Sequence, residues 1–184
     1  MIRHTMPEIA KGVCYGQSDI DVAASFDDEL ALLRAKLPLA PDVVIYSSPS
    51  RRCLQLASAI AGNRPVQQDA RLMELHFGEW ELRHWDDIPR AELDNWANAY
   101  VEHAPPGGES FRAMHGRVAA FLHALTETAC EAPVVIVTHA GVIRAMLAEA
   151  LQLPLTDAFR FHLDFGSVTQ LLLRQALEIG YVNR

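Results

Sequence analysis

The sequence predicts an α/β fold in which helices cover both faces of a mostly parallel sheet. Two stretches carry this prediction, because in each a short run of β-branched residues is followed by a turn and then by a helical pattern. The third observation is the order of the elements, since strands that alternate with helices along a chain form parallel sheets. We therefore expect a three-layer α/β/α sandwich with a mostly parallel central sheet.

The first of these stretches follows a very short strand at the start of the chain. Only Met1 and Ile2 precede the pair Arg3-His4, so either this strand is unusually short or the native sequence begins upstream of Met1. The run "PDVVIYSSPS" (41–50) then predicts a buried strand that ends in turn residues. The helical pattern "RRCLQLASAIAG" (51–62) follows and ends at Gly62, a residue type that commonly stops a helix.

The second stretch is "APVVIVTHAG" (132–141), a buried strand followed by the helix "VIRAMLAEALQL" (142–153). A long amphipathic helix is expected before it, over residues 109–129. The segment "AFRFHLDFGSVTQLLLR" (158–174) contains two strand-like runs separated by Asp164-Phe165-Gly166, and predicts an antiparallel hairpin at the edge of the sheet. Because no linker or repeat interrupts the pattern, we expect one domain, residues 1–184.

Composition limits the possible function. The formal net charge of −7 argues against a nucleic-acid partner, although a local cluster of arginines can still attract a small anionic substrate. No apolar run approaches the length needed to span a membrane. The cysteines are odd in number, widely spaced and in no CxxC pattern, which favours reduced thiols of a cytoplasmic protein over disulfides or a zinc site: Cys14, Cys53 and Cys130.

The candidate catalytic and binding residues lie where the predicted strands end. In open α/β sheets, ligands bind outside the carboxyl ends of the strands. The side chains expected there are Arg3, His4, Ser47, Ser48, Arg51, Arg52, Thr138 and His139, with Gly141 at the following helix start. Taken singly, Arg51 and Arg52 suggest a solvated helix start and His139 a core histidine. Cations are disfavoured at a helix N-terminus, however, so their presence together at this edge favours an anion site.

A carboxylate completes the candidate site. Glu74 lies within "RLMELHFGEWE" (71–81), among several large apolar side chains. Apolar surroundings raise the pKa of a carboxyl group, and a carboxyl group that is protonated near neutrality suits a general acid. The alternative is a surface glutamate on an amphipathic turn, and the pattern leaves both open.

Taken together, these motifs resemble a known family. The fragments "RH", "SSPSRRCLQLA", "ELHFGEWE", "PPGGESF" and "VTHAG" occur in the order seen in the histidine phosphatase superfamily, which has a phosphoglycerate-mutase-like fold. The resemblance extends from residue 2 to about residue 175. Within the superfamily, "RHTMP" followed by "CYGQSD" is most similar to the α-ribazole-5′-phosphate phosphatases of cobalamin biosynthesis.

This resemblance implies a role for each candidate. His4 would be the nucleophile that forms a phosphohistidine intermediate. Arg3, Arg52 and His139 would bind the phosphoryl oxygens, and Glu74 would protonate the leaving alcohol and then activate water. Thr5 stands where the family usually has glycine, so its hydroxyl is expected to contact the phosphate. The chemistry requires no metal and no cofactor, and the partner would be a phosphorylated small molecule.

Two departures from the family pattern bear on the reaction. Ala140 follows His139, where acid phosphatases and phytases carry an aspartate, so the acid is expected to be Glu74. The cap expected at about residues 80–108 is short, which suits a phosphatase that admits water better than a mutase that excludes it.

Several alternatives stay open at this point. The chain could be a broad-specificity sugar or nucleotide phosphatase, a phosphoglycerate mutase or a non-catalytic phospholigand-binding module. Trp80, Trp85 and Trp96 could stack on a flat base or pack the cap. The sequence is compatible with a monomer or a homodimer.

Overall fold

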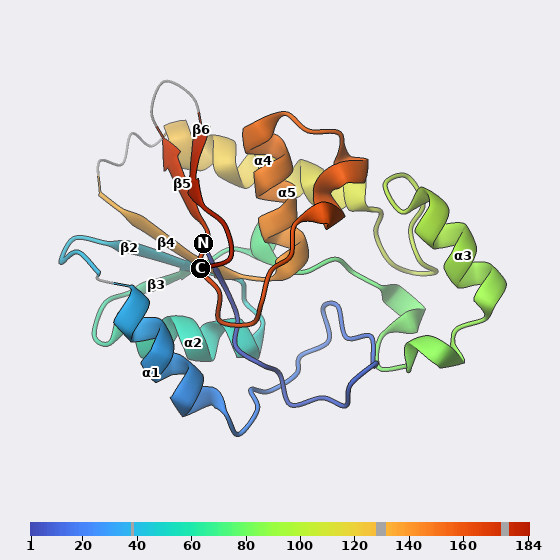
Figure 1. Ribbon diagram of the computed structural model, residues 1–184, viewed down its shortest axis with the longest axis horizontal. Helices are drawn as coiled ribbons and strands as arrows, with labels where there is room; N and C mark the ends of the chain where they lie inside the picture. The colour runs from blue at the N-terminus through green and yellow to red at the C-terminus, as the bar shows by residue number, and fades with distance from the viewer. Residues whose placement is uncertain (38, 128–131, 174–176) are drawn as a thin grey trace.

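The computed structural model describes residues 1–37, 39–127, 132–173 and 177–184 (Figure 1). Its central sheet has four parallel strands in the order β1-β4-β2-β3. The strands are β1 (Ile2–Arg3), β2 (Val44–Ser47), β3 (Val66–Gln68) and β4 (Val134–Thr138). The helices are α1 (Phe26–Lys36), α2 (Arg51–Ala61), α3 (Arg90–Ala99), α4 (Phe111–Glu127) and α5 (Ala140–Leu151).

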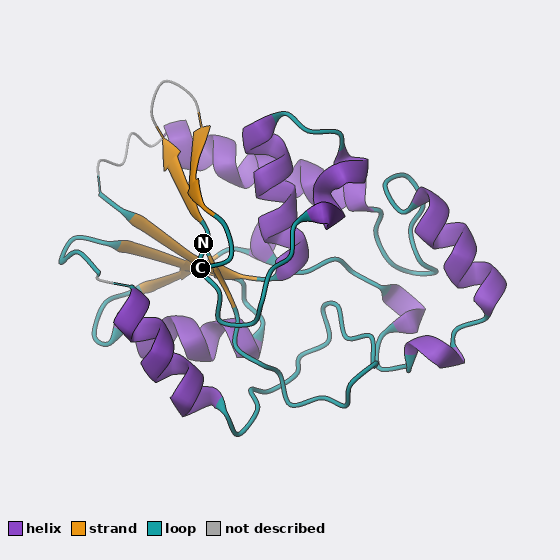
Figure 2. Ribbon diagram, in the orientation of Figure 1, coloured by secondary structure: helices purple, strands orange, loops and turns teal. Residues whose placement is uncertain are grey.

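Helices cover the sheet on both faces, as the sequence predicted. Figure 2 shows α1 and α2 on one side of the strands and α4 and α5 on the other. On the first side, Leu33 of α1 and Leu56 of α2 pack against Ile45 of β2. On the second side, Phe121 and Met146 form a core with Ile136 of β4. Burial on two faces explains why the central strands are continuous apolar runs rather than alternating ones.

An antiparallel pair of strands is present as a separate two-stranded sheet, but the predicted position of its hairpin is wrong. The hairpin pairs β5 (Gln170–Leu173) with β6 (Leu177–Tyr181), so its first strand is the end of the predicted segment. The earlier half, predicted as a strand, instead contains the end of a 3₁₀ helix, Leu155–Arg160. Its apolar residues Ala158 and Leu163 are buried in core clusters that include side chains of α5, without strand pairing. A short apolar run signals burial, and burial alone does not specify a strand.

The remaining predicted elements differ from the structure mainly at their ends. The helix expected at 142–153 begins earlier, at Ala140, and the helix expected at 109–129 begins at Phe111, with residues 128 and 129 outside the described part of the chain. The sequence did not predict α1 or β3. Their apolar patterns are weak, since α1 buries only Leu30 and Leu33, and β3 has no buried residue.

Residues 80–108, where the cap is expected, contain α3 and an aromatic cluster. Trp80 is buried, and its ring lies edge-on to Trp96 and Trp85, at centroid distances of 5.7 and 6.4 Å. Of the two interpretations of these tryptophans, the structure shows the packing one. Cys14 belongs to the same cluster and, like Cys53, is a buried free thiol, whereas Cys130 lies outside the described residues.

Candidate active site

The carboxyl ends of β1, β2 and β4 bring most of the predicted residues together. Arg3 ends β1, and the backbone N–H of His4 donates to the carbonyl of Thr138 at 2.9 Å, which joins the ends of β1 and β4. The rings of His4 and His139 lie 5.2 Å apart in an edge-on arrangement. Arg52 enters the same region from the first turn of α2.

His4 is held in a form that can act as a nucleophile. Its ring is buried, and Nδ1 lies 2.7 Å from the carbonyl oxygen of Thr5. A carbonyl only accepts hydrogen bonds, so Nδ1 carries the proton and Nε2 keeps its lone pair. Burial lowers the pKa of His4 well below the usual value, and the nearby charges of Arg52 and Arg3 lower it further. The imidazole is therefore neutral at neutral pH.

Arg52 is a fully buried cation bonded to neutral acceptors. Its guanidinium donates to the carbonyls of Gly16 and Ser18, at 2.7 and 2.8 Å, and to Nδ1 of His139 at 3.2 Å. Within the described part of the chain it has no carboxylate partner. A buried charge without a counter-ion favours the binding of an anion.

Arg51 behaves differently from its neighbour. Its side chain is about half exposed and pairs with Asp19 and Asp21, at 3.7 and 3.3 Å. Two adjacent cations at the start of a helix predicted a bound anion. For Arg51 that interpretation is wrong, because two aspartates of the chain compensate its charge.

His139 is also buried and neutral. Because Arg52 donates to Nδ1, the ring proton lies on Nε2, which is 2.8 Å from the hydroxyl of Ser48. Burial lowers the pKa of His139 well below its usual value, and the charge of Arg52 adds to this effect. The Sγ atom of Cys53 lies 3.5 Å from Nε2, and burial raises the pKa of that thiol.

Three unpartnered polar atoms belong to residues that flank or approach His4. Among the described residues, Nε of Arg3, Nε of Arg52 and Oγ1 of Thr5 are buried without a hydrogen-bond partner. Buried polar atoms in proteins are almost always paired. A group of such atoms that includes two guanidinium donors and one hydroxyl is chemically suited to the oxygens of a phosphate.

The segment predicted as a hairpin turn instead borders this site. The guanidinium of Arg3 stacks on the ring of Phe165, with Cζ 3.6 Å from the ring centroid. Arg3 also donates to the carbonyl of Leu163 at 2.5 Å, and the N–H of Gly166 donates to the carbonyl of His4 at 3.2 Å. These contacts fix the backbone and the cation beside the nucleophile.

Glu74 lies against the start of α5. One carboxylate oxygen accepts from the N–H of Leu75 at 2.9 Å, and the other accepts from the N–H of Gly141 at 3.1 Å. A Cβ atom at position 141 would lie 2.2 Å from Oε1 of Glu74, so only glycine permits this approach. The apolar neighbours in the sequence do not supply these contacts: Leu72 and Leu75 turn into the core, and the carboxylate bonds to backbone N–H groups.

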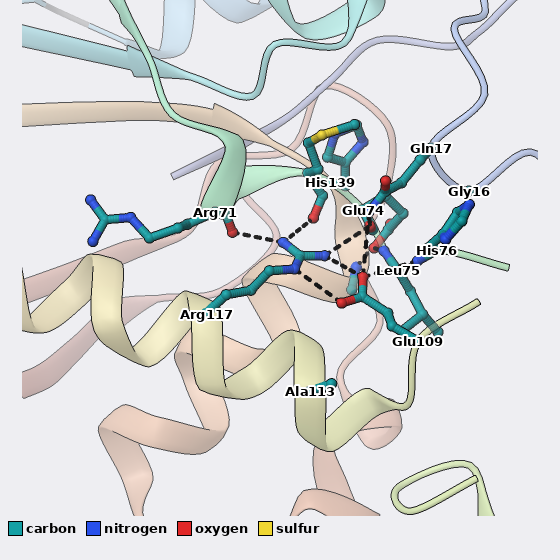
Figure 3. Close-up of polar contacts among 12 residues, drawn as sticks. Gly16, Gln17, Arg71, Glu74, Leu75, His76, Glu109, Ala113, Arg117 and His139 are labelled. Carbon is teal, nitrogen blue, oxygen red and sulfur yellow. Dashed lines mark hydrogen bonds and ion pairs between the residues drawn. The ribbon is translucent and has the colours of Figure 1, made fainter. Parts of the chain in front are cut away.

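Figure 3 shows further residues around Glu74 to which the sequence assigned no role. Arg117 of α4, Glu109 and Gln17 all hydrogen-bond to the segment that carries Glu74 or to one another. The sequence did mark Arg117 as unusual, because this charged residue lies between the apolar positions Met114 and Val118 of an amphipathic helix. Gln17 lies in the fragment "CYGQSD" that carries the resemblance to α-ribazole-5′-phosphate phosphatases, but the sequence assigned it no role.

The described residues contain no group of three or more His, Cys, Asp or Glu side chains that could hold a metal ion. Within the same ranges, none of the helices combines the length and the apolar character needed to cross a membrane.

Comparisons with known proteins agree on a family. The model of the histidine phosphatase superfamily (branch 1) matches residues 1–177. Glucosyl-3-phosphoglycerate phosphatase of Mycolicibacterium vanbaalenii is 31% identical over 171 residues, which cover 85% of this chain and 75% of that protein. Phosphoserine phosphatase 1 of Hydrogenobacter thermophilus is 27% identical over 173 residues, with coverage of 91% and 82%.

A solved structure is also similar over the whole chain. The crystal structure of the α-ribazole phosphatase from Shigella flexneri superposes with a TM-score of 0.89 at 25% identity, and the match covers 100% of this chain and 94% of that one. The names of all three proteins describe phosphatases, but their substrates differ.

Proposed function

Since this chain belongs to the histidine phosphatase superfamily, branch 1, and is a phosphatase, we propose that it hydrolyses phosphomonoesters through a phosphohistidine on His4. One observation carries the proposal: a neutral, buried imidazole whose Nε2 keeps its lone pair lies beside Arg3, Thr5 and Arg52, which hold unpartnered buried polar atoms. Phosphoryl transfer depends mainly on positioning and on positive charge around the phosphoryl oxygens, which is what these residues offer.

In the first step, Nε2 of His4 bonds to phosphorus while the bond from phosphorus to the ester oxygen breaks. Arg3, Arg52 and Thr5 bind the phosphoryl oxygens as charge develops on them, and His139 lies beside Arg52 in the same cluster. Glu74 gives its proton to the departing alcohol oxygen. In the second step, Glu74 takes a proton from water, the water oxygen attacks phosphorus, and His4 leaves as neutral imidazole with inorganic phosphate as product.

We propose α-ribazole 5′-phosphate as the substrate, which would place the enzyme in cobalamin biosynthesis. The support is the pairing of "RHTMP" with "CYGQSD" and the likeness to the Shigella α-ribazole phosphatase. Phosphoserine is the second candidate, because a phosphoserine phosphatase is similar at comparable identity. Measuring kcat/KM on a panel that contains both esters, with glucosyl-3-phosphoglycerate as a third, decides between them.

The phosphohistidine is tested by His4→Ala. Wild-type protein mixed with ³²P-labelled substrate and quenched should retain protein-bound phosphate that is labile in acid and stable in base. His4→Ala should lose both this label and turnover. His123→Ala, which changes an exposed histidine of α4, serves as the matched control and should keep both. Robust turnover by His4→Ala would remove the proposal.

A further inference from the structure

The segment that carries Glu74 has no regular secondary structure of its own. It begins after the short 3₁₀ helix Ala70–Leu72 and reaches Gly78 without a helix or strand. Proton transfer requires the carboxylate at a defined distance from the leaving oxygen. Since the segment's own backbone does not fix it, contacts from other elements must hold Glu74 in place.

Arg117 supplies the largest set of these contacts. Its guanidinium donates to three carbonyls, that of Arg71 in the preceding 3₁₀ helix at 2.7 Å and those of Met73 and Glu74 in the segment at 2.6 and 2.9 Å (Figure 3). The planar fork of an arginine can bridge several acceptors at fixed geometry, which a lysine ammonium cannot do. The side chain is about 20% exposed, so water competes little for these bonds.

Glu109 joins Arg117 to the part of the segment that follows Glu74. Its Oε1 accepts from Arg117 at 2.6 Å and from the backbone N–H of His76 at 3.0 Å. The side-chain amide of Gln17 donates to the carbonyl of Glu74 at 2.9 Å and approaches the same Oε1 at 3.4 Å. The residues before and after Glu74 are therefore both hydrogen-bonded to one partly buried ion pair.

The same contacts reach the phosphate side of the site. Gly16 and Ser18, which flank Gln17, offer the carbonyls that bind the guanidinium of Arg52. One short loop thus contacts both the residue proposed to bind the phosphoryl group and the segment proposed to carry the acid. A change in the ion pair would shift the acid relative to the phosphate.

We propose that Arg117 and Glu109 are positioning residues that hold Glu74 at the distance needed for proton transfer to the leaving group, an inference that rests on the proposed role of Glu74. Neither residue is proposed to touch the phosphate. Their loss should therefore affect the step that needs a proton and spare the step that does not. Esters with poor leaving groups need the acid, whereas p-nitrophenolate leaves unprotonated.

The experiment compares Arg117→Met with wild type on ribose 5-phosphate and on p-nitrophenyl phosphate. We expect kcat for ribose 5-phosphate to fall by about 10- to 100-fold with little change in KM, since misplacement of a catalytic group by about 1 Å has effects of this size. The rate of the p-nitrophenol burst should change by less than about 3-fold. In a Glu74→Gln background, Arg117→Met should add less than about 3-fold on ribose 5-phosphate, because the acid is already absent.

Arg112→Met is the matched control. Arg112 lies on the same helix and also pairs with a glutamate, Glu102, at 2.8 Å, but this pair is about 60% exposed and the contacts of its guanidinium lie outside the segment that carries Glu74. It should behave as wild type on both esters. If Arg117→Met does not fold, Glu109→Gln and Arg117→Lys keep a similar shape and should show the same selective loss at smaller size.

Equal losses on the two esters, or a full additional loss in the Glu74→Gln background, would overturn the positioning role. The proposed function fails separately. If Glu74→Gln alone shows no dependence on the leaving group, then Glu74 is not the acid. If Glu74→Gln shows that dependence and the Arg117 and Glu109 variants do not, only the positioning role is wrong.

Discussion

His4 and His139 each combine burial with a neighbouring guanidinium, and both effects lower their pKa values. In the unfolded chain a histidine titrates near pH 6.5. Below that pH the unfolded state binds protons that the folded state does not, so acid favours unfolding. The stability of the folded protein is therefore unaffected by these groups above about pH 6.5 and decreases as the pH falls below it.

This predicts the pH dependence of unfolding. Each of the two histidines should reduce the free energy of unfolding by about 1.4 kcal/mol between pH 7.5 and pH 5.5. Urea denaturation at the two pH values measures the difference, which should be smaller in His139→Gln than in wild type. His123→Gln, at an exposed position, should keep the wild-type difference. An unchanged pH dependence in His139→Gln would contradict the neutral, buried state of that ring.

At the scale of elements, the contact between α5 and Glu74 depends on a glycine, which has no side chain, in the first turn of α5. Gly141 lies in the first turn of α5, and a Cβ there would meet the Glu74 carboxylate at 2.2 Å. Gly116 of α4 is a matched position, because a Cβ there would have no neighbour within 4 Å. Glycine in a helix interior is less favourable than alanine by about 1 kcal/mol.

Alanine should therefore be tolerated at position 116 and should reduce activity at position 141. Gly116→Ala should raise the free energy of unfolding by about 0.5–1 kcal/mol without changing activity. Gly141→Ala should displace Glu74 and reduce kcat for ribose 5-phosphate by at least about 10-fold, with a smaller effect on the p-nitrophenol burst. Chemical denaturation and the two rate measurements check both. Wild-type activity in Gly141→Ala would mean that Glu74 can act from another position.

The sequence predicted well those elements whose apolar pattern is compatible with only one type of secondary structure. The runs that became β2 and β4 are buried on both faces, so they contain almost only apolar residues, and the helices after them follow directly. The prediction for the segment around Ala158 failed because burial of a 3₁₀ helix against α5 gives the same apolar pattern as a strand. α1 was missed because it buries only two side chains.

The residues of the site also fall into a group that the sequence predicted and a group that it did not. His4, Arg52 and His139 were predictable because strand ends in a parallel sheet share one edge. Arg117 and Gln17 act on backbone carbonyls, and a carbonyl is present at every residue, so the sequence does not mark where such a contact will form. Their partners become visible only when α4 and the segment before Gly78 are placed side by side.

For the whole molecule, the proposed phosphate site joins parts of the chain that are distant in sequence. Arg3 and Thr5 come from the end of β1, Arg52 from α2, and His139 from the end of β4. In the described part of the chain, the unpartnered atoms of the first three are polar groups that an oxyanion would pair. A bound oxyanion should therefore stabilise the folded protein as a unit, by linkage between binding and folding.

Vanadate in buffer stripped of metal ions on a chelating resin tests this linkage. At about 100 times its Kd, vanadate should stabilise the protein by about 2.7 kcal/mol, which for a chain of this length raises Tm by roughly 5–11 °C. EDTA should leave the phosphatase activity intact, and removal of metal ions on the resin should leave the Tm shift intact, because the proposed ligands are guanidinium, hydroxyl and imidazole groups rather than a metal. Thr5→Val removes one unpartnered hydroxyl at nearly constant shape, so it should bind vanadate more weakly, by about 1 kcal/mol, without loss of stability in the absence of vanadate. A Tm shift that requires added divalent metal, or that is unchanged in Thr5→Val at subsaturating vanadate, would place the oxyanion elsewhere.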